Sequence, residues 1–378
     1  MPDYLHTKGR TKTKGEQNRM KFTVNTNDFA EAIEKAYKGV ARKAYTAVLE
    51  NVHISVNDGI CRLNSTNIEQ YVSTKIDAYE ADNMAFIFRD TKAVLKAMKF
   101  FTGEHIVFEQ TDKNSVKMTC STKKAEVLTS EADVFPDFPE VTGEQYVYSS
   151  GKLAARYSAV KYAESKSDSR PVMMGIHFNR ADCVTCDGYR LAINTDNNLT
   201  VNKPFTVPDN ALKLCSDILS GDITITANGK HIQIEDGSTT IISRLFDGEY
   251  FDYHKVIPTN VNSVTVNVKD FCDNLKYLKT FADKVPAAWH GNKLALVKSD
   301  GRFDCEIDMN GSFDFTIGFD ITFMLEALNQ CKDTKTLNML MPERNVNAIT
   351  MQNDNDFALI LPVRLKDGDP FQTAEDVA

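Results

Sequence analysis

Hydrophobic and polar residues along the chain follow a pattern that occurs three times. In each copy a short strand-like run leads into a helix with apolar residues at helical spacing, and further strands and a second helix follow. The opening strand and helix of the copies lie at 21–24 and 27–40, 146–148 and 152–164, and 263–266 and 269–282. The second strand and helix lie at 86–88 and 91–101, 205–207 and 209–219, and 315–317 and 320–331. The pattern predicts six helices in three pairs.

Turn residues divide the alternating segments between these helices. Asp58-Gly59 and Asn228-Gly229 each separate two alternating runs, which is typical of β-hairpins. A repeat of roughly 115 to 120 residues holds enough helix and strand for a core of its own, so each copy is a domain rather than a solenoid unit. The sequence thus predicts an α+β fold with three repeated domains at 20–141, 142–260 and 261–365, each with two helices packed on antiparallel strands.

Two terminal segments fall outside this pattern. Residues 1–19 are polar and basic, and we interpret them as a disordered leader, a cloning remnant or misassigned start rather than a nucleic-acid-binding arm. Residues 366–378 form an acidic tail, which we expect to be disordered and to leave partner binding unaffected when deleted.

Composition favours an ordinary soluble protein. The 378 residues are 42% hydrophobic and 25% charged, with no apolar run long enough for a membrane helix and no secretory signal, so we expect a cytoplasmic protein. Eight scattered cysteines do not resemble a disulfide framework. The net charge of -8 argues against a protein that coats DNA by bulk attraction.

No pattern in the chain indicates a catalytic or metal centre. Cys183 and Cys186 have the spacing of a redox or half-zinc motif, but no second Cys or His pair accompanies them, and residues three apart in a strand point to opposite faces. The chain has neither a phosphate-binding glycine loop nor a nucleophile-elbow motif. We therefore expect no enzyme activity, no cofactor and no metal.

Basic residues recur on one face of several predicted helices. For any single helix the ordinary interpretation is a solvated surface, but recurrence on equivalent helices suggests a lining that contacts phosphates without reading bases. The residues concerned are Lys35, Lys38, Arg42, Lys92, Lys96, Lys99, Lys152, Arg156, Lys276 and Lys279.

Several short phrases, in order from 20 to 365, resemble the bacterial β sliding clamp family, the processivity subunits of replicative DNA polymerase III. Each phrase alone is weak, but their order over three domains is specific. The phrases are Met20-Lys21-Phe22-Thr23-Val24, Phe135-Pro136, Asp187-Gly188-Tyr189-Arg190-Leu191-Ala192, Leu245-Phe246-Asp247-Gly248, Asp252-Tyr253, Val256-Ile257-Pro258, 319–328 and Leu361-Pro362-Val363-Arg364-Leu365.

The resemblance implies a non-catalytic crescent that forms a head-to-tail homodimeric ring around double-stranded DNA, with helices lining the hole. Its partners would be the replicative polymerase, the clamp loader and other proteins with a clamp-binding motif. A heterologous interface closes such a ring. Here Val127 would face Leu278 and Phe281 of the other subunit, and Lys43 joins the DNA-facing residues.

The family also implies a cleft between the second and third domains that binds a short partner peptide. Apolar, methionine and aromatic side chains there suit Leu and Phe anchors, and Arg190 and Arg364 suit polar groups. The chain departs from the family at Ala47 and Phe251, usually Pro, and at Cys186, usually Thr. The matching residues are Arg170, Val172, Met173, Cys186, Gly188, Tyr189, Arg190, Leu191, Phe251, Val256, Asp320, Phe323, Val346, Ala348, Leu359, Leu361, Pro362, Val363 and Arg364.

Two other classes stay open from the sequence. A peptide-binding adaptor would keep the cleft but lack a basic lining and a ring. An enzyme would lose activity, with its fold intact, on substitution of one or two carboxylates in a shared pocket.

Overall fold

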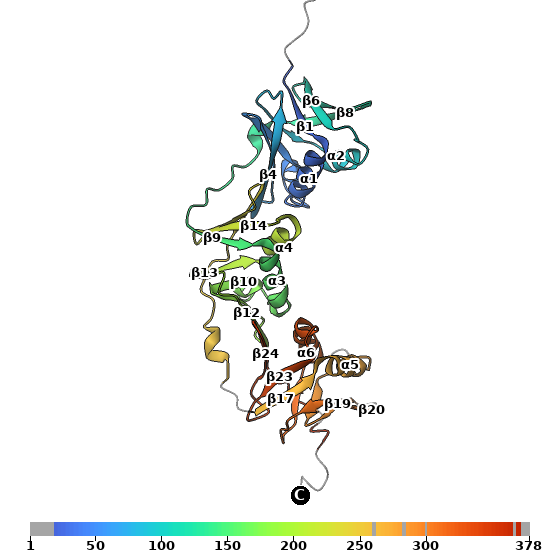
Figure 1. Cartoon of the computed structure of the whole chain (residues 1–378), viewed down its shortest axis with the longest axis vertical. Helices are drawn as coiled ribbons and strands as arrows, with labels where there is room; N and C mark the ends of the chain where they lie inside the picture. The colour runs from blue at the N-terminus through green and yellow to red at the C-terminus, as the bar shows by residue number, and fades with distance from the viewer. Residues whose placement is uncertain (1–18, 259–261, 282–284, 299–300, 366–367, 372–378) are drawn as a thin grey trace, which may run out of the picture. The chain divides into compact units, whose positions relative to one another are not determined.

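The computed structural model describes residues 19–258, 262–281, 285–298, 301–365 and 368–371 (Figure 1). The predicted leader, Arg19 apart, lies outside the described residues. The chain divides into two compact units. The first holds the chain up to Glu140 together with Gly237–Ile241, and the second holds Val141–Asp236 together with the chain from Ile242 onward.

Within the described residues six α-helices occur in three pairs, as the sequence predicts. Side chains of Asn25, Asp90, Asn267 and Asp320 cap the free amide groups at the first turn of four of them. The helices are α1 (Thr26–Tyr37), α2 (Thr91–Met98), α3 (Ser150–Val160), α4 (Asp209–Ile218), α5 (Val268–Lys279) and α6 (Ile321–Leu328). Short 3₁₀ turns are η1 (Ala47–Glu50), η2 (Ala132–Val134), η3 (Lys161–Ala163), η4 (Pro171–Met174), η5 (Tyr253–Val256) and η6 (Asn329–Cys331).

The first unit is an antiparallel sheet packed against α1 and α2. Its strands are hydrogen-bonded in the order β1-β6-β7-β8-β5-β2-β3-β4, and β1 also pairs with β4. Phe22 and Phe108 stack at 4.6 Å beneath α1 and anchor its core. The strands are β1 (Lys21–Asn25), β2 (His53–Asn57), β3 (Ile60–Thr66), β4 (Gln70–Tyr79), β5 (Met84–Phe88), β6 (His105–Asp112), β7 (Ser115–Cys120) and β8 (Lys123–Ser130).

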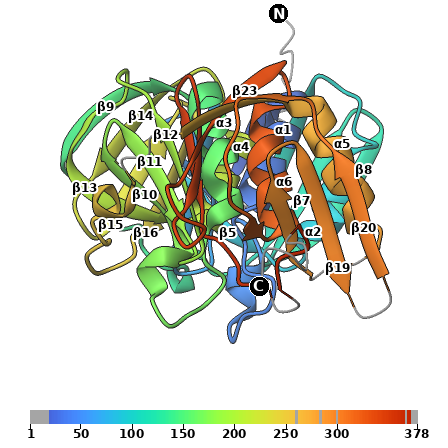
Figure 2. The same ribbon diagram turned by 90° about the horizontal axis from the view of Figure 1, so that it is seen from below.

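The second unit holds the second and third copies of the pattern, here named the second repeat (β9 to η5) and the third repeat (β17 to β25). One nine-stranded sheet, ordered β13-β10-β11-β12-β25-β24-β23-β17-β21, runs through both. Figure 2 shows its second-repeat strands β10, β11, β12 and β13 side by side. β9, β14 and β15 pair in a further sheet of the second repeat. The second-repeat strands are β9 (Glu144–Ser149), β10 (Gly175–Arg180), β11 (Asp182–Cys186), β12 (Arg190–Thr195), β13 (Val201–Pro208), β14 (Asp222–Ala227), β15 (His231–Glu235) and β16 (Thr239–Arg244), of which β16 belongs to the first unit up to Ile241.

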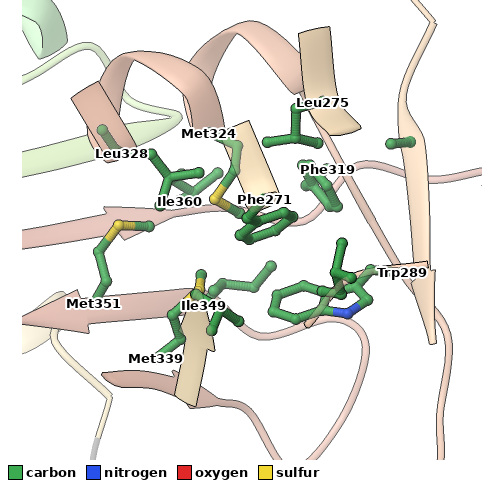
Figure 3. Close-up of a cluster of buried hydrophobic side chains, with 14 of the residues drawn as sticks. Phe271, Leu275, Trp289, Phe319, Met324, Leu328, Met339, Ile349, Met351 and Ile360 are labelled. Atoms are coloured by element: carbon green, nitrogen blue, oxygen red, sulfur yellow. The ribbon is translucent and has the colours of Figure 1, made fainter. Parts of the chain in front are cut away.

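The third repeat adds a four-stranded sheet ordered β20-β19-β18-β22. Trp289, which is fully buried, lies in its core against Phe271 and Phe319 (Figure 3). Its indole nitrogen donates to the carbonyl of Gly291 at 2.7 Å. The third-repeat strands are β17 (Asn262–Asn267), β18 (Ala287–His290), β19 (Lys293–Lys298), β20 (Gly301–Glu306), β21 (Met309–Asn310), β22 (Ile317–Phe319), β23 (Thr336–Met341), β24 (Ile349–Asn353) and β25 (Asp356–Ile360).

Three details differ from the sequence-based expectation. The strand expected at 315–317 lies at Ile317–Phe319, where Gly318 accepts a hydrogen bond from the amide of Val363. The predicted helices extend too far at their C-termini, and after α3 and α6 the surplus residues form the 3₁₀ turns η3 and η6 instead. The described part of the tail makes contacts with the third repeat. The ring centroid of Phe371 lies 5.3 Å from the guanidinium carbon of Arg302 and 5.8 Å from the ring centroid of His290. The predicted domain bounds stay predictions.

In the described part of the chain, none of the helices combines the length and apolar character needed to cross a membrane.

Candidate partner-binding site

The candidate site forms where the second and third repeats share strands. β12 pairs with β25 in antiparallel register, with Arg190 opposite Ile360 and Leu191 opposite Leu359. Beyond the paired strands, the amide of Leu361 donates to the carbonyl of Tyr189 at 2.9 Å. Residues far apart in sequence therefore lie at fixed positions beside one another.

A buried apolar cluster spans this junction and gathers several residues that the sequence assigned to the cleft. Met173, Cys186, Leu191, Ala348 and Leu359 are buried in it. Val172 and Phe251 pack against it and are partly exposed. Burying these groups together removes apolar surface from water and so stabilises the cluster, which forms the base of the candidate site.

Large apolar side chains stay exposed on the segments that border this cluster. Tyr189 is 65% exposed and Val346 is 70% exposed, and Val256, Leu361 and Val363 also face solvent. Tyr189 approaches the ring of Phe323 at 6.5 Å between centroids. Exposed apolar groups next to a rigid floor are typical of a surface that binds another molecule.

Arg190 connects the two repeats electrostatically. Its Nε donates to Asp187 at 2.9 Å, and its Nη1 donates to Glu326 of α6. The guanidinium also lies 4.2 Å from the ring centroid of Phe323 and 5.5 Å from that of Tyr162. Since the side chain is nearly buried, these contacts satisfy its charge within the protein.

The remaining predicted cleft residues fall into two groups. Arg170, Gly188 and Arg364 are exposed, and Pro362 is half-buried. Asp320 instead accepts hydrogen bonds from the amides of Thr322 and Phe323, at 2.7 and 3.1 Å, and so caps α6. Its carboxylate is therefore already occupied by the helix terminus.

Cys183 and Cys186 lie on opposite faces of β11, as strand geometry requires. Both are free thiols, and Cys186 belongs to the apolar cluster, whereas Cys183 does not. Burial raises the pKa of the Cys183 thiol to about 12. It also raises the pKa of Cys186. Protonated thiols that point apart do not form a redox pair, and the described residues contain no cluster of side chains suited to a metal ion.

Most of the predicted DNA-facing residues are exposed on their helices or adjoining loops. Lys35 is half-buried and pairs with Glu31 at 2.7 Å, Lys276 pairs with Asp273 at 3.4 Å, and Lys279 is half-buried. The exposed residues are Lys38, Arg42, Lys43, Lys92, Lys96, Lys99, Lys152 and Lys276.

Arg156 is the exception, and its prediction as a DNA-facing residue is wrong. The side chain is only 3% exposed. Its Nε donates to Asn194 at 2.9 Å, and its Nη2 donates to the carbonyl of Ala181 at 2.6 Å. Asn194 in turn donates to Asp356 of β25 at 2.7 Å. Arg156 fits the helical spacing of a basic stripe, but it points into the protein and joins α3 to the shared sheet.

The predicted dimer-interface residues differ in how exposed they are. Leu278 is fully buried in the third-repeat core, so its assignment to the interface is wrong. Val127 is half-buried, and its neighbour Leu128 is 61% exposed. Phe281 stacks on Phe303 at 3.9 Å beside exposed Tyr277, so this aromatic group is the accessible part of that helix end.

Sequence reasoning missed Glu326, Tyr162 and Tyr253. Glu326 sits on the polar side of α6, and no local signal could pair it with Arg190 across 136 positions. Tyr253 could have been found, because it lies within one of the family-like phrases. It is buried in the apolar cluster, and its hydroxyl donates to Asp182 at 2.7 Å.

Comparisons with known proteins identify the family. Residues 20–139 match the model of the DNA polymerase III beta subunit N-terminal domain, and residues 149–252 match that of its central domain. The two matches together cover more than half of the chain. The chain belongs to the DNA polymerase III beta subunit family. Members of this family are sliding clamps, which are processivity factors rather than catalysts.

Known members of the DNA polymerase III beta subunit family align with this chain over nearly its whole length. The beta sliding clamp of Streptococcus pneumoniae serotype 4 is 23% identical, over 91% of this chain and 99% of its own length. That of Chlamydia pneumoniae is 24% identical, over 92% of this chain and all of its own length. The crystal structure of a beta subunit from Eubacterium rectale superimposes with a TM-score of 0.82 at 23% identity, covering 91% of this chain and 100% of the other. The Thermotoga maritima beta subunit gives 0.79 at 20% identity, covering 92% and 100%. These two structures show the same fold.

Proposed function

We propose that the chain is a DNA sliding clamp, a processivity factor that encircles duplex DNA as a homodimeric ring and tethers the replicative polymerase to it. The single observation that carries the partner-binding part is the apolar cluster joining β11, β12 and β25, bordered by exposed Tyr189 and Leu361. A clamp needs such a preformed anchor site because its partners must attach without disturbing the ring.

The partner site takes a short peptide with Leu and Phe anchors from the polymerase, the clamp loader or other proteins with a clamp-binding motif. Tyr189, Val256, Val346, Leu361 and Val363 supply exposed apolar contacts. Exposed Arg170 and Arg364 are available for polar groups of the peptide. Arg190 is a positioning residue in this proposal, since its charge is already paired with Asp187 and Glu326.

Contact with DNA is assigned to exposed lysines and to the loop that carries Arg42 and Lys43. Lys92 and Lys96 of α2 and its C-cap residue Lys99 are exposed, whereas Val94 and Met98 are buried on the other side of the helix. Ammonium groups on the exposed side of a helix can contact phosphates without reading bases, so the interaction with DNA is weak and salt-sensitive. The net charge of -8 over the whole chain opposes general adhesion to DNA and favours free sliding.

Ring closure is assigned to two strands with open edges, β8 in the first unit and β20 in the third repeat. Within the described residues, 123–127 of β8 pair only with β7, and β20 pairs only with β19. Unpaired edges invite pairing with another chain. Leu128 of β8, Phe303 of β20 and the neighbouring Tyr277 and Phe281 supply the apolar part of a heterologous interface.

The decisive experiment measures retention on DNA. The protein is loaded onto nicked circular DNA by its matching loader with ATP, and the complex is gel-filtered before and after linearisation. A topological ring stays on the circle and is lost from the linear form. Equal retention on both forms would mean ordinary surface binding, and no retention on either would favour a peptide-binding adaptor that does not encircle DNA.

A further inference from the structure

A cavity in the second repeat overlaps the candidate partner site in only a few residues. It has a volume of about 440 Å³ and is lined by residues of strands β10 and β13, by Gly229 and by the segment 245–253. The amide of Phe246 donates to the carbonyl of Thr206 at 3.0 Å and fixes one end of this segment. Tyr250, Phe251 and Tyr253 line the cavity and also belong to or pack on the apolar cluster of the partner site.

Aromatic rings form much of the cavity wall and hold one another in place. His177 stacks on Tyr250 at 4.3 Å, and Tyr250 stacks on Phe251 at 5.2 Å. Tyr253 is fixed by two hydrogen bonds, one donated to Asp182 at 2.7 Å and one accepted from Asn179 at 3.3 Å. The cavity is thus a rigid aromatic recess, and a ligand would not need to order its walls.

The charges that line the cavity are of one sign. Asp247, Glu249 and Asp252 contribute carboxylates, of which Asp252 pairs with exposed Lys255 at 3.2 Å. Among the described residues, no lysine or arginine lines the cavity. His177 adds no positive charge at neutral pH, because burial lowers its pKa to about 4. Aromatic faces combined with carboxylates recognise cations, since a ring face and an anion both attract positive charge.

We propose that this cavity is a side pocket of the partner site and takes a basic side chain, arginine or lysine, that flanks the anchors of the partner peptide. The inference rests on the proposed function, since the peptide must first occupy the site over the apolar cluster. Phe251 and Tyr253 join the two, because both line the cavity and both belong to or pack on that cluster. The large ring of Phe251, where the family usually has proline, forms part of the shared wall.

The test uses fluorescein-labelled peptides that carry Leu and Phe anchors and differ at one flanking position at a time, arginine against glutamine. Affinity for the full chain is measured by fluorescence anisotropy. We expect arginine to strengthen binding about threefold to tenfold at one or more positions, the range of a partly exposed cation–π contact beside carboxylates. Lysine at that position should give a smaller gain, because its compact ammonium group is more strongly hydrated.

Two variants of equal charge separate the pocket from general attraction to an acidic protein. Asp247→Asn with Glu249→Gln should remove the arginine advantage and leave the glutamine peptide unchanged. Asp222→Asn with Asp314→Asn, at exposed carboxylates that do not line the cavity, should keep it. No arginine advantage at any position, or an advantage that survives in the pocket variant, would overturn the side pocket alone. Failure of both peptides to bind the unaltered chain would overturn the partner site and the side pocket together.

Discussion

Replacing Arg190 with methionine should loosen the third repeat from the second. The variant keeps the apolar stem but removes a guanidinium that pairs with Asp187 and Glu326 and lies over Phe323. Breaking a buried ion pair typically costs about 3–5 kcal/mol, and a cation–π contact contributes about 0.5–2 kcal/mol. Glu326 is 42% exposed and is rehydrated when its partner is lost, so its share is smaller. We expect a net loss of about 2–4 kcal/mol.

Trp289 provides the assay, because it is the sole tryptophan and lies fully buried in the third-repeat core. Its emission during urea denaturation reports unfolding of that repeat, and the midpoint should fall in Arg190→Met. A double-mutant cycle with Glu326→Gln should give a coupling of about 1 kcal/mol. As a matched control, Lys269→Met removes an exposed pair with Asp273 on α5 and should leave the midpoint unchanged. An unchanged midpoint in Arg190→Met, or fully additive single changes, would refute the bridging role.

Four further predictions follow from the site and the surfaces. Burial lowers the pKa of His177 from 6.5 to about 4, so the unfolded chain takes up a proton that the folded chain excludes. Stability should therefore fall by up to about 3 kcal/mol as the pH drops from 6.5 to 4, and an NMR imidazole titration with a midpoint near 6.5 would disprove this. Charge reversal of Lys92, Lys96 and Lys99 should shorten retention on circular DNA without changing peptide affinity; unchanged retention in the folded variant would exclude α2 from the DNA contact. Leu128→Asp should shift the sedimentation coefficient from dimer to monomer, and a persistent dimer would contradict the β8 edge as the interface. Deleting 366–378 should leave peptide affinity unchanged, because its described part contacts Arg302 and His290 rather than the partner site; a changed affinity would place the tail at that site.

Periodicity was enough to predict the six helices and the hairpins at Asp58-Gly59 and Asn228-Gly229. These elements depend on local signals, namely apolar spacing, capping side chains and turn residues. The short strand β22 was misplaced by two positions because its register depends on pairing with β18 rather than on its own alternation.

The candidate site could be predicted only in part. Met173, Cys186, Leu191, Ala348 and Leu359 do meet in one cluster, and the resemblance to known clamps supplied that set. Arg156 and Leu278 show why spacing is not enough. A helix with basic residues at helical spacing can turn one arginine inward, where Asn194 and the carbonyl of Ala181 accept its hydrogen bonds. An apolar residue near a helix end can belong to the core. The ion pair of Arg190 with Glu326 requires knowing that β12 lies beside β25, which is tertiary information.

The hydrogen-bonded pairing of β12 with β25 has a kinetic consequence. Five register pairs join β12 and β25, the two strands of the proposed partner site. A peptide that binds there would meet strands that are already paired, so little backbone would have to be ordered on binding. Association rates should then be similar for competing partners, set by diffusion and orientation. Exchange of partners at the clamp would then be governed by their dissociation rates. The partner that dissociates most slowly would occupy the site longest, and another partner could bind only after it has dissociated.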